Sequence, residues 1–187
     1  MHAAPTNPPP PPEADAAASA YIARWRDAGG SERANYQLFV GELCALLGLP
    51  APEPAQGDER DNAYVFERRV SFAHGDGSAS AGFIDCYRRG AFVLEAKKLK
   101  AGKDGALTKG FDDALLRVRA QAEGYARALP AVAGRPPFLV VVDVGHRIEL
   151  YSEFSRSGGS YVPFQDPRSH RIALDDLRKP EILDRLR

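Results

Sequence analysis

The sequence predicts an α/β or α+β domain with one mixed central sheet flanked by helices. Apolar residues recur every three or four positions in three segments, a spacing that is typical of amphipathic helices. Between and after these segments lie short apolar runs, alternating or continuous, that are typical of strands. The third helical segment stands between two groups of strands, so it can act as a crossover that allows parallel pairing.

Two helices are expected near the start of the chain, at 16–28 and between Ser31 and Gly48. Ser31 is suited to cap the second helix, because its hydroxyl can accept a hydrogen bond from a free amide of the first turn. Gly48 can take the left-handed conformation that commonly ends a helix. The most regular helical pattern lies at 111–129.

Strands are expected at 64–73, in a hairpin over about 81–97, at 138–142 and at about 147–154. The run at 138–142 is continuously apolar and predicts a central strand buried on both faces. Gly145-His146 is expected to form a two-residue turn into the next strand. After Gly159 the chain is expected to be irregular, apart from short helices near 175–178 and from Pro180.

The length of 187 residues suits one domain with appendages. We expect a disordered, proline-rich tail at 1–15 and one folded domain at 16–187. Within that domain the expected parts are N-terminal helices at 16–60, a sheet core at 61–155 and a C-terminal extension at 156–187.

Charge and cysteine content argue against several functional classes. The 25 basic and 25 acidic residues give a formal net charge of zero, so nucleic-acid binding would have to rely on local patches. Cys44 and Cys86 form no disulfide framework and no Cys-x-x-Cys zinc signature, which favours reduced core cysteines in the cytoplasm. No apolar run approaches the roughly 20 residues of a membrane span, and the N-terminus lacks a secretory signal pattern.

Three charged residues interrupt the apolar strands of the hairpin, namely Asp85, Glu95 and Lys97. A buried charge is costly unless it is paired or binds a metal. Glu95 and Lys97 are two positions apart on one strand and therefore share a face. Two acids and a lysine that point to one place can hold a divalent cation and a water, so the pattern indicates a metal-dependent nuclease centre. The ordinary alternative is an acid at a strand edge beside a surface Glu–Lys pair.

Whether Asp85 shares a face with Glu95 depends on the register of the hairpin. A two-residue turn would point the two side chains to opposite faces. A three-residue loop at 88–90 would pair Asp85 with Val93, and the two carboxylates would then be diagonal neighbours, about 7–8 Å apart. This second arrangement suits Gly90, which can take the left-handed conformation at the end of such a loop.

The three residues have complementary roles in phosphodiester hydrolysis. Asp85 and Glu95 would hold Mg²⁺, which favours one or two carboxylates together with waters and phosphate oxygens. The metal would polarise the scissile phosphate and lower the pKa of a bound water. Lys97 would stabilise the negative charge that develops on the phosphate, or orient the attacking water.

The residues around this centre resemble the PD-(D/E)XK nuclease superfamily. Asp85, nine intervening residues and Glu95-Ala96-Lys97 are similar to its Asp...Glu-x-Lys motif, although Ile84 stands where the motif has proline. The order of the expected elements matches its restriction-endonuclease-like αβββαβ core. The resemblance implies a DNA nuclease whose metal is held by Asp85, Glu95 and the backbone carbonyl of Ala96.

Further residues are candidates through this resemblance, each with a plain structural alternative. Gln121 and Tyr125, four positions apart on the long helix, resemble the Gln-x-x-x-Tyr element of RecB-like nucleases, or else are a boundary glutamine and a core tyrosine. Glu42 resembles the extra acid that the first core helix supplies in some members, or else lies on a solvated helix face. Four basic residues either contact DNA phosphates or lie on a solvated surface: Lys98, Lys100, Lys103 and Arg117.

Several stretches look more specifically like the N-terminal nuclease region of MmeI-like, type IIL restriction-modification proteins. They lie at 21–25, 32–39, 92–97 and 141–146, and the resemblance covers about residues 18–187. In that family one polypeptide cleaves double-stranded DNA and also methylates adenine with S-adenosylmethionine through later domains. The resemblance implies a Mg²⁺-dependent endonuclease domain of a bacterial, cytoplasmic protein, with dimerisation for cleavage.

Three hypotheses remain open at this point. The leading one is a Mg²⁺-dependent endonuclease domain of a restriction-modification protein. The second is a catalytically silent module that binds DNA or another partner. The third is a fragment or truncated gene product whose main function is adenine-specific DNA methylation. That function would belong to C-terminal methyltransferase and target-recognition domains that are absent from this sequence.

Overall fold

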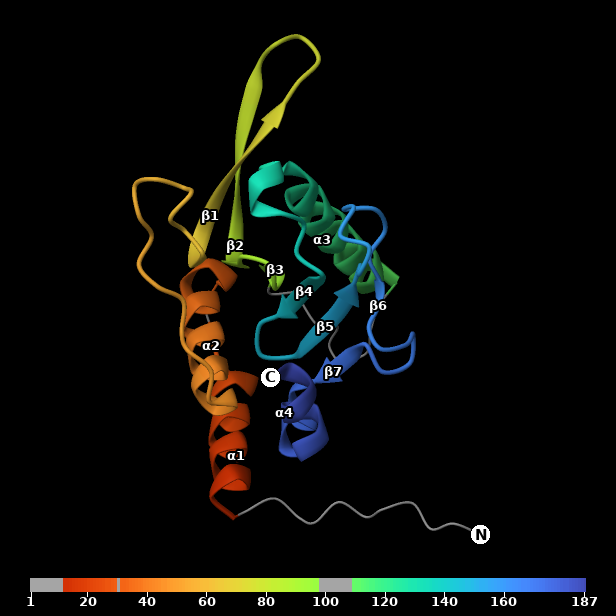
Figure 1. Cartoon of the computed structure of the whole chain (residues 1–187). Helices are drawn as coiled ribbons and strands as arrows, with labels where there is room; N and C mark the ends of the chain where they lie inside the picture. The colour runs from red at the N-terminus through yellow and green to blue at the C-terminus, as the bar shows by residue number, and fades with distance from the viewer. Residues whose placement is uncertain (1–11, 30, 98–108) are drawn as a thin grey trace.

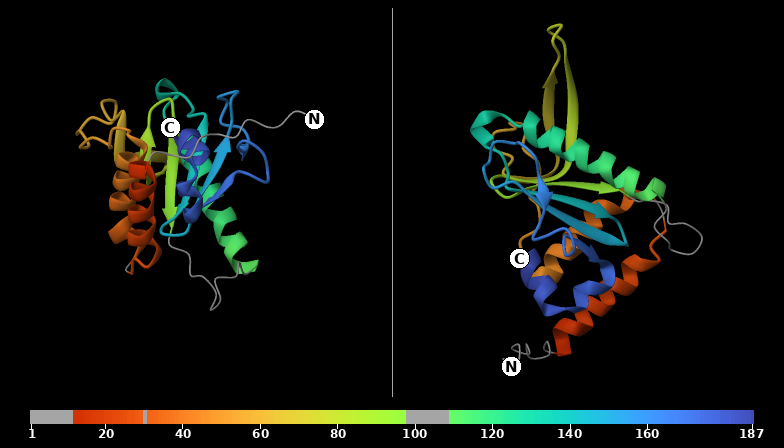
Figure 2. Two further views of the ribbon diagram at one scale, coloured as in Figure 1. Left: turned by 90° about the horizontal axis from the view of Figure 1, so that it is seen from below. Right: turned by 90° about the vertical axis from the view of Figure 1, so that its right-hand side faces the viewer.

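The computed structural model of the protein describes residues 12–29, 31–97 and 109–187. One mixed sheet lies between two layers of helices (Figures 1 and 2). Helix α3 (Lys109–Ala128) covers one face, while α1 (Pro12–Arg26), α2 (Glu32–Leu47) and α4 (Pro180–Leu186) cover the other. The predicted fold class is therefore confirmed. None of the helices in these residues is long and apolar enough to cross a membrane.

The sheet has seven strands, and six of them follow the order β1-β2-β3-β4-β5-β6 while β7 also pairs with β5. Their bounds are Tyr64–Ala73, Ala79–Arg88, Phe92–Lys97, Phe138–Asp143, Arg147–Ser152, Val162–Pro163 and Arg171–Ala173. Strands β1 to β3 form the expected antiparallel meander, and β4 pairs with β3 in parallel. The crossover that parallel pairing requires contains α3, as predicted.

The core is divided into two apolar clusters, one on each face of the sheet. Leu94 and Val142 contact the cluster under α1, α2 and α4, whereas Val93 and Val141 contact the cluster under α3. Neighbouring residues of a strand point to opposite faces, so β3 and β4 are buried on both sides. This explains the continuous apolar run of β4, and it buries the charged Glu95 in the middle of β3.

The predicted caps of α2 are both present. The Ser31 hydroxyl accepts a hydrogen bond from the Ala34 amide at 3.3 Å, and Gly48 ends the helix with a φ of +68°. Helix α1 begins at Pro12, four residues earlier than expected, because proline is tolerated in the first turn, where its missing amide has no partner. The expected tail at 1–15 is therefore helical from residue 12, and the rest of it lies outside the described residues.

The C-terminal third differs from the expectation in several ways. The chain after Gly159 is not simply irregular, because β6 and β7 both pair with β5. The short helices expected near 175–178 and from Pro180 are present, as a 3-10 helix at Leu174–Arg178 and as α4, and an unpredicted 3-10 helix spans Ala131–Ala133. The connection from β4 to β5 has three residues rather than two, because Asp143 pairs with Arg147. Strands of two or three residues have too little periodicity to be read from sequence, since their partner is distant along the chain.

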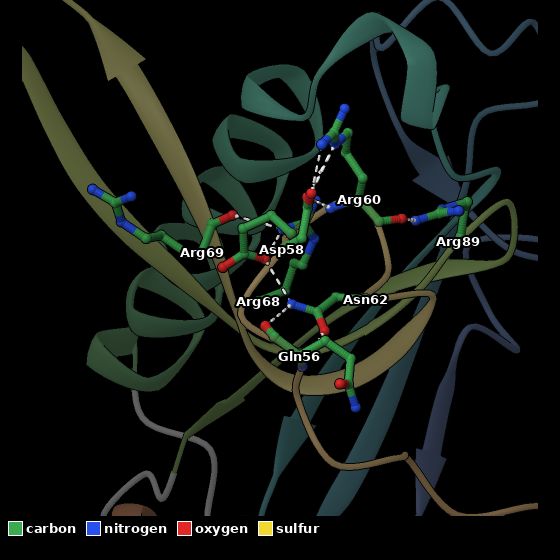
Figure 3. A network of polar contacts seen from close by, with 8 residues as sticks. Gln56, Asp58, Arg60, Asn62, Arg68, Arg69 and Arg89 are labelled. Atoms are coloured by element: carbon green, nitrogen blue, oxygen red, sulfur yellow. Dashed lines mark hydrogen bonds and ion pairs between the residues drawn. The ribbon is translucent and has the colours of Figure 1, made fainter.

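The outer edge of β1 is covered near its start by the preceding polar segment. A short parallel bridge joins that segment to β1, and a network of side chains holds it in place (Figure 3). Asn62 accepts a hydrogen bond from the Gln56 amide at 2.7 Å, and the buried Arg68 pairs with Glu59. No strand of the described residues pairs with this edge further along β1.

The turn between β4 and β5 is expected to tolerate no side chain at Gly145. This glycine has a φ of +86°, and a Cβ there would lie 2.5 Å from the backbone oxygen of Trp25. Gly145→Ala should therefore lower the free energy of unfolding by roughly 2 kcal/mol or more. Gly124→Ala is the matched control, because it lies in α3 with nothing near its Cβ position and should stabilise by up to about 1 kcal/mol. Urea unfolding of both variants checks the prediction, and equal effects would contradict it.

Candidate metal centre

Asp85 and Glu95 are brought together by the register of the β2–β3 hairpin. Cys86 pairs with Leu94, so one step further along places Asp85 opposite Glu95. The prediction of an odd-length loop is confirmed, because three residues, 89–91, join the strands. The predicted position of that loop was wrong by one residue, and Asp85 is opposite Glu95 rather than Val93. The difference arises because β2 continues to Arg88, which still pairs with β1.

The two carboxylates are held beside each other by backbone amides. Ala96 donates its backbone N–H to Asp85 Oδ2 at 2.7 Å, and Asp85 donates its own to Glu95 Oε1 at 3.4 Å. These contacts stand where the regular ladder between β2 and β3 ends, at Cys86 and Leu94. Each acid is therefore positioned by the main chain of the other strand, which leaves little freedom in their separation.

Lys97 lies on the same strand face as Glu95 and contacts an acid from another element. Its Nζ lies 3.5 Å from Glu32 Oε1, and the lysine side chain is 31% exposed. Glu32 belongs to the first turn of α2 and was not among the predicted site residues. A signal for it was present, because Glu32 is four residues before Tyr36 and seven before Phe39, on the apolar face of its helix.

Glu42, the predicted extra acid from this helix, takes no part in the cluster. Its carboxylate accepts a hydrogen bond from Trp25 Nε1 at 2.8 Å and pairs with Arg24 at 3.0 Å. These bonds tie α2 to α1. Glu32, rather than Glu42, is the acid of α2 that reaches Lys97, because it lies on the helix face that packs on the sheet.

Gln121 and Tyr125 reach the centre from α3, as their spacing predicts. Gln121 Nε2 donates to Glu95 Oε2 at 2.9 Å and to the Tyr125 hydroxyl at 3.1 Å. The tyrosine ring packs against Phe72, with ring centroids 5.7 Å apart. It also covers Gly82, where a Cβ would lie only 2.6 Å from the ring. The pair therefore orients Glu95, and contacts of either residue to nucleotides stay a prediction.

A fourth carboxylate borders the cluster from β1. Glu67 has a φ of +53°, which is unusual for any residue other than glycine. The pairing of its neighbours places it opposite Asp85. The Tyr36 hydroxyl donates a hydrogen bond to the Glu67 carboxylate. This strained residue was not predicted from the sequence, and backbone strain of this kind often occurs at functional sites.

The electrostatics of the cluster are unfavourable without a cation. Burial raises the pKa of Asp85 to about 6, although the Ala96 amide and Lys97 oppose this. Burial, followed by the charge of Asp85, raises the pKa of Glu95 to about 9. Glu32 adds to both shifts, so one lysine faces several acids. An added positive charge at this point would stabilise the ionised carboxylates.

The oxygen donors of the cluster fit a hard divalent cation. Mg²⁺ binds through one or two carboxylates and keeps several waters or phosphate oxygens, so Asp85 and Glu95 suffice for it. In the part of the chain that the structure describes, no three His, Cys, Asp or Glu side chains are grouped to hold a metal by themselves. The arrangement therefore suits a partly hydrated ion. The backbone carbonyl of Ala96 stays a predicted third ligand.

Three of the four basic residues predicted to contact DNA lie outside the described residues: Lys98, Lys100 and Lys103. Arg117 is exposed on α3, one turn before Gln121. Its contact with DNA stays a prediction.

The pKa shifts predict how the stability of the metal-free protein depends on pH. Glu95 titrates near 4.5 when unperturbed and near 9 in the fold, so between these values the folded state binds more protons than the unfolded chain. Stability in EDTA should therefore fall as the pH rises through this window. Glu95→Gln should weaken the dependence and leave a smaller fall from Asp85 that ends near pH 6.

Thermal unfolding at stepped pH measures this effect. A change of 1 kcal/mol corresponds to roughly 2–4 °C in Tm for a chain of this size. Glu181→Gln, at an exposed position of α4, is the control and should keep the parental slope. A Glu95→Gln variant with that same slope would show that Glu95 is ionised in the metal-free fold.

Comparison with known proteins agrees with the family that the motifs suggested. No curated protein and no solved structure shows significant similarity to the chain. Residues 13–186 match the family model described as MmeI, N-terminal domain. The matched region contains every element of the cluster, from α2 to α3. The match spans nearly the whole chain, and the protein therefore belongs to the MmeI N-terminal domain family.

Proposed function

We propose that this domain is a Mg²⁺-dependent endonuclease that hydrolyses DNA phosphodiesters within a restriction-modification protein. The observation that carries the proposal is the convergence of Asp85, Glu95 and Lys97, with Gln121 bonded to Glu95. These side chains come from three separate elements. Membership of the MmeI N-terminal domain family supports the same reading.

Each residue has a role that its contacts suggest. Asp85 and Glu95 would hold the Mg²⁺, together with the carbonyl of Ala96. When bound there, the ion would supply Lewis-acid polarisation of the scissile phosphate and activation of a water. Gln121 orients Glu95 through the hydrogen bond to Oε2. Lys97 presents its ammonium group to the phosphate and stabilises the charge that develops there.

Access to the centre is consistent with a large substrate. Glu95 is fully buried, but Gln121 is exposed and Lys97 is partly exposed. A phosphate of duplex DNA can therefore approach the acids from the side of Lys97 and Gln121, while the far side of Glu95 is closed by the core. Such one-sided burial strengthens electrostatic interactions between the side chains and a bound phosphate.

Other functions of the whole protein are part of the same proposal. Adenine methylation with S-adenosylmethionine and recognition of the target sequence would belong to other domains of such proteins, and cleavage would involve dimerisation. A silent DNA-binding module is the second candidate, because Lys97 is already engaged by Glu32 in the structure. The two candidates differ in whether Mg²⁺ leads to cleavage.

Lys97→Ala is expected to reduce Mg²⁺-dependent nicking of supercoiled DNA by roughly 100-fold or more, since it removes a charge placed at the reacting phosphate. The fold should be unchanged, because the lysine is partly exposed and at the end of β3. Lys179→Ala is the control, since Lys179 is an exposed lysine paired with Asp176 near α4. Gel assays of nicking and circular dichroism test both.

Nicking by Lys97→Ala at the parental rate would overturn the proposal. DNA binding without nicking by the parent, together with no thermal shift on adding Mg²⁺, would instead establish the silent module.

Glu32→Gln is expected to lower kcat for nicking by roughly tenfold, with little change in KM for DNA. Glu32 acts as a positioning residue, because its carboxylate is what Lys97 Nζ contacts. Glu42→Gln on the same helix is the matched control and should nick as the parent does, since Glu42 bonds to Trp25 and Arg24. Equal losses in both variants would assign Glu32 a structural role only.

A further inference from the structure

The hairpin of β1 and β2 extends well beyond the rest of the sheet. Strand β3 pairs only with residues 86–88 of β2. The pairing of β1 with β2 continues to Ala73 and Ala79. Residues 68–84 therefore form a two-stranded ribbon, called here the β1–β2 arm, whose outer part projects from the body of the molecule (Figures 1 and 2).

The arm has a defined turn at its tip. The His74 amide donates to the Ser78 carbonyl at 2.8 Å. Asp76 Oδ1 accepts from the backbone amide and the hydroxyl of Ser78 at 2.9 and 2.7 Å. The ring of His74 is 3.0 Å from the Ser80 hydroxyl. These bonds matter because an isolated two-stranded hairpin is only marginally stable in water.

At its base the arm is braced against α3 and linked to the metal centre. The Phe72 and Tyr125 rings are in contact, and Tyr125 also lies over Gly82. The hydroxyl of Tyr125 accepts the hydrogen bond from Gln121, which also donates to Glu95. A continuous series of contacts thus joins the base of the arm to a proposed metal ligand.

The outer part of the arm is thin and polar. Apart from His74 and Asp76 at the tip, its exposed side chains are small: Ser71, Ala73, Ser78, Ala79, Ser80 and Ala81. Phe83, near the base, is the one exposed large apolar residue in the arm, which the structure describes throughout. A protein interface usually has an apolar centre of large side chains, and the arm lacks one. Major grooves of DNA, in contrast, admit a two-stranded ribbon.

The position of the arm also suits DNA. Asp85 directly follows the arm on β2, so a phosphate at the metal centre lies at the base of the arm. The eight residue steps from Gly77 to Asp85 span roughly 25 Å at the rise of a strand. This length is less than the roughly 34 Å of one helical turn of DNA, so the arm can follow a duplex away from the cut.

We propose that the β1–β2 arm enters the major groove of the duplex that the metal centre cuts, and positions the scissile phosphate at Asp85. The proposal rests on the proposed nuclease function. The serine hydroxyls and His74 supply hydrogen bonds to base edges or phosphates. The segment 73–79 carries only His74 and Asp76 as titratable residues, so it adds contacts in the groove rather than positive charge.

Shortening the arm tests the proposal. Residues 73–79 are replaced by Asn-Gly, which closes a tight turn between the paired Phe72 and Ser80. Affinity for a 30-base-pair duplex should fall about tenfold, the loss of a good groove contact. The slope of the affinity with salt should hardly change, because no phosphate-binding cation is removed. Fluorescence anisotropy over a salt series measures both quantities.

A second experiment locates the arm on the DNA. Cys44 and Cys86 are buried, so Ser78→Cys can be labelled selectively with an iron chelate that cleaves nearby DNA. Cleavage should occur within one turn of the nicking position, on both edges of the major groove. The same label at Glu181→Cys on α4 should give no local cleavage. A duplex bound by the labelled Ser78→Cys protein without such cleavage would overturn the proposal.

The outcomes separate this proposal from the nuclease assignment. A shortened arm that leaves affinity and nicking positions unchanged overturns the arm proposal while Lys97→Ala still tests the nuclease. A parent chain that binds no duplex DNA overturns both. A parent that is a dimer and a shortened variant that is a monomer, with equal DNA affinity, would assign the arm to contact between copies instead.

Discussion

The structure depends on placing two carboxylates at one point of the sheet, where Glu95 is buried and Asp85 is partly buried. Like charges in the interior repel and lose their hydration, so such a pair needs compensation nearby. The fold supplies an amide from Ala96 for one acid and the side chain of Gln121 for the other. Lys97 adds a positive charge on the same face. Burial and the neighbouring acids still raise the pKa of both carboxyl groups.

The parallel pairing of β3 with β4 has two consequences for this centre. It requires a crossover, and α3 within that crossover crosses the face of the sheet on which Glu95 lies. Gln121 can therefore reach Glu95 from above. The pairing also buries both faces of β3, which raises the pKa of Glu95 and excludes water behind it. The parallel pairing of β3 with β4 thus determines both the approach of Gln121 and the burial of Glu95.

The centre draws on four elements: the β2–β3 hairpin, and helices α2 and α3 from either side of it along the chain. The face of α2 on which an acid lies decides whether it reaches the centre. Glu32 contacts Lys97, whereas Glu42 of the same helix bonds to Trp25 of α1. At Gly82 the absence of a side chain allows the ring of Tyr125 to approach β2. The arm lies on the same strand as Asp85, so its placement and that of this proposed metal ligand are coupled.

The sequence by itself determined the fold class, the caps of α2 at Ser31 and Gly48, and the pairing of Gln121 with Tyr125. These features depend on local periodicity and on the conformational preferences of single residues, which a sequence displays directly. Only the tertiary structure decided the register that sets Asp85 opposite Glu95, the choice of Glu32 over Glu42, and the short strands β6 and β7. Each of these depends on contacts between segments far apart in the chain, and a shift of one residue reverses which face a strand side chain occupies.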